Sequence, residues 1–168
     1  MTTRHLLIVG ILILKRNCES HAQNTTTKEQ EVIRQALLDA SHRLNNPKCS
    51  AFFGPSGREA LMSAKIQMAP IGPPLSRPGS TGRFQTTALV IAVTYREFQL
   101  ILINRLGPFV EPGKPIGGRL YNKHLTDDDF RAFVLLHELG HLIRKFGAEG
   151  THLHANEEHT DQVFQNCW

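Results

Sequence analysis

The sequence predicts a small domain of the α+β class, and three observations support that prediction. Residues 29–44 place apolar side chains at helical spacing, and residues 86–95 and 98–104 are rich in β-branched and apolar side chains. Residues 127–146 form a long apolar run with helix signals at both ends. We therefore expect an N-terminal helix, a short antiparallel sheet or hairpin, a buried helix and a C-terminal helix.

The N-terminus has the features of a secretory leader. Met1–His5 is a short basic start, Leu6–Leu14 is an apolar stretch too short to span a bilayer, and Ser20–Ala22 has the small-x-small form of a signal-peptidase site. We predict a signal peptide at residues 1–22 and a single domain at 23–168, which is long enough for one core but not for two. The mature protein is then expected to be secreted, periplasmic or at the cell envelope, without stable membrane insertion. Because charged residues precede the cleavage site, an uncleaved, membrane-associated N-terminus is the alternative.

Charge and cysteine usage narrow the class of partner and the compartment. The chain has 19 Lys and Arg against 15 Asp and Glu, and these charges are evenly spread, so a nucleic-acid partner is not expected. Of the three cysteines, Cys18 is lost with the leader. The two that remain, Cys49 and Cys167, predict a disulfide in an exported protein, with a pair of buried thiols as the alternative.

The first half of the domain reads as a helix followed by a hairpin. Apolar residues at positions 32, 33, 36, 37, 38, 40 and 44 predict an amphipathic helix over residues 29–44. A weaker helical pattern covers Gly57–Met68, and the proline- and glycine-rich Ala69–Gly82 predicts a loop. Thr86–Tyr95 and Phe98–Asn104 predict two strands joined by a tight turn at the residues between them.

The apolar run near the C-terminus predicts a helix over residues 127–146. Thr126 is a good N-cap, with Asp129 three residues later as its reciprocal partner, and acidic residues suit the positive end of a helix dipole. Gly147 stands where a left-handed C-cap is expected. Because residues 130–143 are apolar on nearly every side, the helix should be packed in a core.

Within that helix stands the H-E-x-x-H motif, formed by His137, Glu138 and His141. Residues four apart lie on one helix face, so the two imidazoles can close on one Zn²⁺ and Glu138 can take a proton from a metal-bound water. The alternative is a pair of core histidines hydrogen-bonded to backbone, with Glu138 at the surface. Since buried polar side chains are costly without a partner, a metal ion is the simplest explanation.

Downstream, Asn156-Glu157-Glu158-His159-Thr160-Asp161 completes a resemblance to the gluzincin metallopeptidases, including the thermolysin-like enzymes. Those proteins pair H-E-x-x-H with N-E-x-x-[S/T]-D on a later helix. The resemblance implies that Glu157 is the third zinc ligand and that Asp161 orients a zinc-bound histidine. The residues themselves leave Glu158, His159 and Asp161 open as alternative ligands.

The resemblance implies a zincin-like fold and a zinc metallopeptidase that acts on a peptide or protein substrate. Tyr121 and His159 are the favoured donors to the tetrahedral oxyanion, while His124 and His152 stay possible. In such enzymes a sheet edge pairs with an extended substrate. We expect Leu100–Asn104, leading into the segment around Pro108, to be that edge, unless Pro108 simply ends a core strand.

A second functional hypothesis is a non-catalytic zinc-binding or envelope interaction domain that keeps the same fold. Zinc binding alone requires His137, His141 and one further ligand, so the presence of Glu138 favours catalysis.

Overall fold

The computed structural model describes residues 28–71, 91–110, 125–147 and 153–168. The chain divides into two compact units, Met1–Arg34 and Gln35–Trp168. The predicted signal peptide lies outside the described residues, and the assignment of residues 23–168 to one domain stays a prediction.

Residues 28–43 are helical, which confirms the amphipathic helix predicted over residues 29–44. The part of this helix in the second unit buries Ala36, Ala40 and Ser41, and Leu44 is buried directly after it. The spacing of four between Ala36 and Ala40 places both on one face, as the apolar pattern of the sequence predicts.

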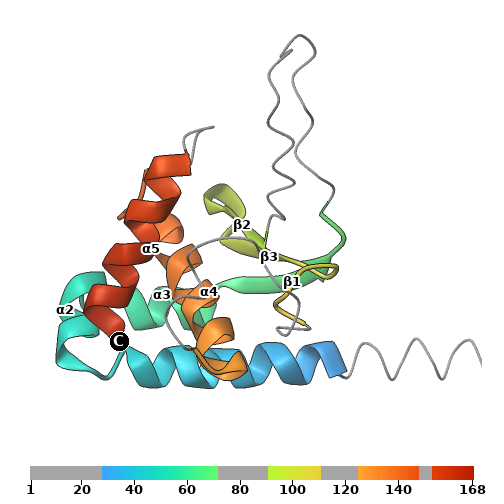
Figure 1. The fold of residues 1–168 in the computed structure, drawn as a ribbon, viewed down its shortest axis with the longest axis horizontal. Helices are drawn as coiled ribbons and strands as arrows, with labels where there is room; N and C mark the ends of the chain where they lie inside the picture. The colour runs from blue at the N-terminus through green and yellow to red at the C-terminus, as the bar shows by residue number, and fades with distance from the viewer. Residues whose placement is uncertain (1–27, 72–90, 111–124, 148–152) are drawn as a thin grey trace, which may run out of the picture. The chain divides into compact units, whose positions relative to one another are not determined.

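The second unit is of the α+β class, as predicted (Figure 1). Its elements are, in order, α2 (Pro47–Phe53), α3 (Gly57–Ser63), β1 (Lys65–Ala69), β2 (Ala92–Tyr95), the 3-10 turn η1 (Arg96–Phe98), β3 (Leu100–Asn104), α4 (Asp127–Leu142) and α5 (Leu153–Cys167). Local chemistry sets the start of α2, because the Asn46 side chain accepts a hydrogen bond from the Lys48 N–H at 2.9 Å and Pro47 suits the first turn.

The described sheet is mixed, with the strand order β1-β3-β2. β2 and β3 pair antiparallel, which confirms the predicted hairpin, whereas β1 and β3 pair parallel, so the expectation of a purely antiparallel sheet was wrong. The predicted tight turn was also wrong. The strands are joined by η1 and by Gln99, which has a left-handed φ of 47°.

One expected helix and one expected sheet edge are wrong for the same reason, which is the parallel pairing of Lys65–Ala69 with β3. This pairing turns the end of the predicted helix Gly57–Met68 into a strand, and only α3 is helical. It also makes β3 the central strand, so Leu100–Asn104 is not a sheet edge. Ile101 and Ile103 are fully buried, as expected for a central strand.

The core is built around α4, which contacts α3, β2 and α5, while α2 packs against α5 (Figure 1). This confirms the prediction of a buried helix. The buried apolar side chains of α4 are Phe130, Ala132, Phe133, Val134, Leu135, Leu136 and Leu139.

α4 begins as predicted but ends earlier. The Thr126 hydroxyl accepts a hydrogen bond from the Asp129 N–H at 3.1 Å, which confirms the N-cap. The helix ends at Leu142 rather than at residue 146, and the left-handed residue is Arg144, with φ of 62°, so the prediction of Gly147 as C-cap was wrong. The Phe146 N–H bonds back to the Gly140 carbonyl at 3.1 Å, because the chain reverses to pack Phe146 on the helix.

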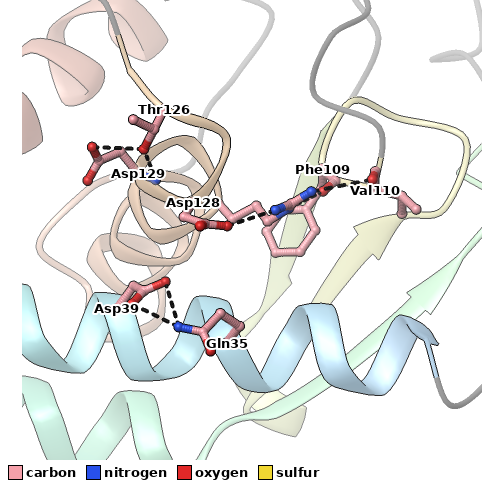
Figure 2. A network of polar contacts seen from close by, with 8 residues as sticks. Gln35, Asp39, Phe109, Val110, Thr126, Asp128 and Asp129 are labelled. Atoms are coloured by element: carbon pink, nitrogen blue, oxygen red, sulfur yellow. Dashed lines mark hydrogen bonds and ion pairs between the residues drawn. The ribbon is translucent and has the colours of Figure 1, made fainter.

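Side-chain contacts tie the first half of α4 to its neighbours. Arg131 donates to the carbonyl oxygens of Phe109 (2.9 Å) and Val110 (3.5 Å) and pairs with Asp128, as Figure 2 shows for these partners.

Asp129 accepts hydrogen bonds from the Thr126 hydroxyl and from Arg43 (Figure 2 shows the Thr126 contact). Burial alone would raise the pKa of Asp129, but these hydrogen bonds and the Arg43 charge outweigh it and lower that pKa below its ordinary value.

Cys49 of α2 and Cys167 of α5 form a disulfide, which confirms that prediction. Their Cα atoms are 4.6 Å apart and 118 positions separate them in sequence. The bond therefore fixes the end of α5 to α2. Among the described residues, no helix combines the length and the apolar composition required to cross a membrane.

Candidate functional site

His137 and His141 lie close together on α4 and are both buried. Their Nε2 atoms are 3.3 Å apart. The other ring nitrogen of His141, Nδ1, lies 3.1 Å from the Gly147 carbonyl oxygen. Because a carbonyl can only accept, Nδ1 carries the proton and Nε2 of a neutral His141 presents its lone pair toward His137.

This spacing suits a shared metal ion. Zinc–nitrogen bonds of about 2.05 Å at the tetrahedral angle separate two nitrogens by about 3.3 Å. The same separation also allows one imidazole to donate a hydrogen bond to the other. The distance alone therefore does not distinguish a shared metal ion from a direct hydrogen bond. The second half of the alternative interpretation is wrong, however, since Glu138 is only 7% exposed and does not lie at the surface.

Thr94 of β2 holds the Glu138 side chain. Its hydroxyl lies 2.7 Å from Glu138 Oε2 and 3.2 Å from the Glu138 carbonyl oxygen. The hydroxyl therefore donates to the carboxylate, and β2 is the strand that packs on α4. The sequence carries no signal for this contact, because a threonine within a strand is ordinary for its β-propensity alone.

Two further rings, those of Phe146 and His159, lie beside the histidine pair. Phe146 is 2% exposed and its ring centroid lies 5.6 Å from that of His137 and 5.4 Å from that of His141. It stacks on His159 at 4.3 Å with an interplanar angle of 10°. Apolar surroundings of this kind keep water away from a site and strengthen its electrostatic interactions.

Gly140, inside the H-E-x-x-H motif, makes the approach of Phe146 possible. A Cβ atom at this position would lie 2.1 Å from Phe146 Cε2. Only a residue without a side chain therefore allows Phe146 to lie against the helix. The contact of Phe146 with the histidine pair was not predicted, although the sequence shows an aromatic residue shortly after the motif.

The acidic residues predicted on α5 differ from His159 in their exposure. Glu157, Glu158 and Asp161 are exposed, whereas His159 is half-buried. The ring centroid of His159 lies 6.4 Å from that of His137 and 5.6 Å from that of His141. In the part of the chain that the structure describes, no three His, Cys, Asp or Glu side chains are arranged as a metal-binding group.

Tyr121, His124 and His152, the other residues considered as oxyanion donors, lie outside the described residues. The site that can be described therefore consists of a histidine pair, a buried carboxylate held by Thr94, and an aromatic lining that includes a third histidine. Comparison with protein-family models, with curated proteins and with solved structures gives no match for this chain.

Proposed function

We propose that this chain is a zinc-dependent metallopeptidase in which His137 and His141 bind the metal and Glu138 is the general base. The observation that carries the proposal is the 3.3 Å separation of the two Nε2 atoms, together with the Gly147 carbonyl that fixes the tautomer of His141. A metal-binding histidine usually donates its other N–H to a carbonyl or carboxylate in this way.

A bound zinc would supply Lewis-acid chemistry, because it polarises a carbonyl group and lowers the pKa of water toward neutrality. Glu138 would accept the proton of the attacking water and pass it to the leaving amine. Thr94 is a positioning residue in this scheme, since its hydroxyl limits the rotation of the Glu138 carboxylate. Tyr121 stays a predicted donor to the developing oxyanion.

The third ligand would come from α5, which packs against α4. The gluzincin resemblance implies Glu157 for this role and Asp161 as the carboxylate that orients a histidine. A zincin-like fold is part of the same proposal. It is supported by an α+β unit in which a buried helix carries the motif and an outer strand, β2, packs on that helix.

The substrate class we propose is an extended peptide or protein segment. β2 is an outer strand of the described sheet, and its Thr94 reaches Glu138. An extended segment that paired with β2 would therefore run close to the proposed base. The Cys49–Cys167 disulfide supports action in an oxidising compartment, as proposed for an exported protein.

One observation favours a second candidate function, a non-catalytic zinc-binding or envelope interaction domain. Glu138 is buried and hydrogen-bonded to Thr94, so its carboxylate has a structural partner that would also be useful without catalysis.

A Glu138→Gln variant separates the two functions because it keeps the size of the side chain and its ability to accept from Thr94. For a peptidase, we expect unchanged zinc content and a loss of casein or peptide-library hydrolysis of about 10²–10⁴-fold. The exposed Glu97 offers a matched control, Glu97→Gln, which should hydrolyse like the wild type. A wild-type protein that binds zinc but hydrolyses nothing in the library would favour the interaction domain.

A further inference from the structure

We infer that the third zinc ligand is the imidazole of His159, not the carboxylate of Glu157. The inference rests on the proposed zinc site and concerns which residue completes it. Three imidazole rings lie near one another on two helices, His137 and His141 on α4 and His159 on α5.

Two of the three ring separations are close to those of a three-imidazole zinc site and the third is larger, so the three side chains are not arranged as a metal-binding group as they stand. With zinc–nitrogen bonds of about 2.05 Å at the tetrahedral angle, the ring centroids of two ligands lie roughly 5 Å apart. The observed centroid separations are 5.1 Å for His137 and His141, 5.6 Å for His141 and His159, and 6.4 Å for His137 and His159. A shift of the His159 ring by about 1 Å would bring it to the ligand spacing.

The surroundings of His159 keep its ring beside the histidine pair. It stacks nearly parallel on Phe146, with centroids 4.3 Å apart, and Phe146 is itself buried against both histidines of α4. The Nδ1 atom of His159 is fully buried, as is the Nδ1 atom of His137. A ring enclosed on its flat face by another ring loses little further freedom when a metal binds, which favours binding.

The geometry of α5 separates His159 from the acidic residues. Residues two apart on a helix point about 200° from one another, so Glu157 and His159 cannot both face the histidine pair. His159 shares its face with Val163, which is fully buried. Glu157 and Asp161 share another face, and both are exposed. The face of α5 that is turned to the protein interior is therefore the one that carries His159.

Ligation by His159 has a consequence for the other assignments. It removes His159 from the expected oxyanion donors. It also gives the metal three neutral nitrogen ligands. The ion and its protein ligands would then carry a net charge of +2, whereas a carboxylate ligand would lower that charge.

The test is metal binding by the full chain with its disulfide intact, measured by elemental analysis, by zinc titration and by X-ray absorption at the zinc edge. We expect one zinc per wild-type chain and three imidazole ligands in the absorption spectrum. His159→Phe keeps a ring that can stack on Phe146 but offers no ligand, and it should weaken zinc binding by more than about 100-fold, beyond the usual effect of a residue that only supports a ligand. Glu157→Gln should keep the stoichiometry and the imidazole count.

The other possible results would contradict either the assignment of His159 or the proposed function itself. Loss of zinc in Glu157→Gln with retention in His159→Phe would overturn the inference and leave the proposed peptidase standing with Glu157 as ligand. Retention in both variants, with loss in His137→Phe, would overturn it too, because the third ligand would then lie elsewhere. A wild-type chain that binds no zinc would refute the proposed function itself. Far-UV circular dichroism identifies a variant that has failed to fold, and His159→Gln then replaces it in the comparison.

Discussion

Gly140→Ala tests the packing that encloses the histidine pair. A Cβ atom at this position would lie 2.1, 2.3 and 2.8 Å from three ring carbons of Phe146. The ring cannot move away freely, because it is buried and stacks on His159. We therefore expect the substitution to force the ring and the turn that carries it away from α4.

Two opposing effects set the size of the change. Alanine is favoured over glycine inside a helix by about 1 kcal/mol. Overpacking a core typically costs roughly 1–3 kcal/mol, and a fully displaced Phe146 would approach the roughly 3–5 kcal/mol of a Phe→Ala substitution. The clash exceeds the helix preference, so we expect a net loss of about 2 kcal/mol in the free energy of unfolding.

The assay is urea unfolding with the disulfide intact, followed by far-UV circular dichroism and by fluorescence of Trp168, the single tryptophan. With a urea dependence of about 1–3 kcal/mol per molar, the midpoint should fall by about 1 M. Gly147→Ala is the matched control, because nothing lies within 4 Å of a Cβ atom there, and it should change stability little. In a Gly140→Ala background, Phe146→Leu should be less damaging than it is alone, since the smaller side chain relieves the clash. If Gly140→Ala instead stabilised the protein by the helix preference, the packing of Phe146 on α4 would be refuted.

Three further predictions concern other contacts. Thr94→Val removes the hydroxyl that donates to Glu138, and we expect a loss of about 1–3 kcal/mol in stability and slower peptide hydrolysis at unchanged zinc content, whereas Thr94→Ser should resemble the wild type. Reduction of the Cys49–Cys167 bond, which closes a loop of 118 positions, should lower the free energy of unfolding by at most about 5 kcal/mol in the chain-entropy account, and an unchanged urea midpoint under dithiothreitol would contradict it. The pKa of Asp129 is lower in the folded state than the ordinary value of about 3.9. The ion pair with Arg43 therefore stabilises the fold above about pH 3.9, and this stabilisation is lost as the pH falls through the folded-state pKa. Acid unfolding of Asp129→Asn should accordingly be less steep below about pH 4, and identical acid titrations of variant and wild type would exclude that contribution.

Local signals in the sequence were sufficient for the N-terminal helix and for the start of α4. The cap formed by Thr126 and the apolar spacing of residues 29–44 act within a few residues, and both are found in the structure. The disulfide was also predictable, because only Cys49 and Cys167 remain once a leader is assumed.

Contacts between distant segments were not predictable in the same way. Most of Lys65–Ala69 falls within the weak helical pattern of Gly57–Met68, and it becomes a strand only because β3 offers a parallel partner. The early end of α4 has the same origin, since the position of Phe146 over Gly140 decides where the chain reverses. The glycine at position 147 looked like the better cap by local preference, but tertiary packing prevailed.

The residues of the candidate site also differ in how far local sequence predicts them. The residues of the motif itself could be read directly, since their spacing on one helix is fixed by helix geometry. Which face of α5 turns inward could not, because that depends on how the helix rolls against α4 and α2. Thr94 was invisible for the same reason, as its partner Glu138 belongs to a segment that follows it by many residues.

The parallel pairing of β1 with β3 also bears on how fast this protein folds. The hairpin of β2 and β3 closes over a few residues, an event that takes about 1–10 μs in isolated hairpins. The partnership of Lys65 with Leu100 joins segments that are far apart along the chain, and such closures lose much chain entropy before any contact forms. Folding should therefore wait on the docking of β1, with an overall rate in the millisecond-to-second range expected for domains rich in non-local contacts.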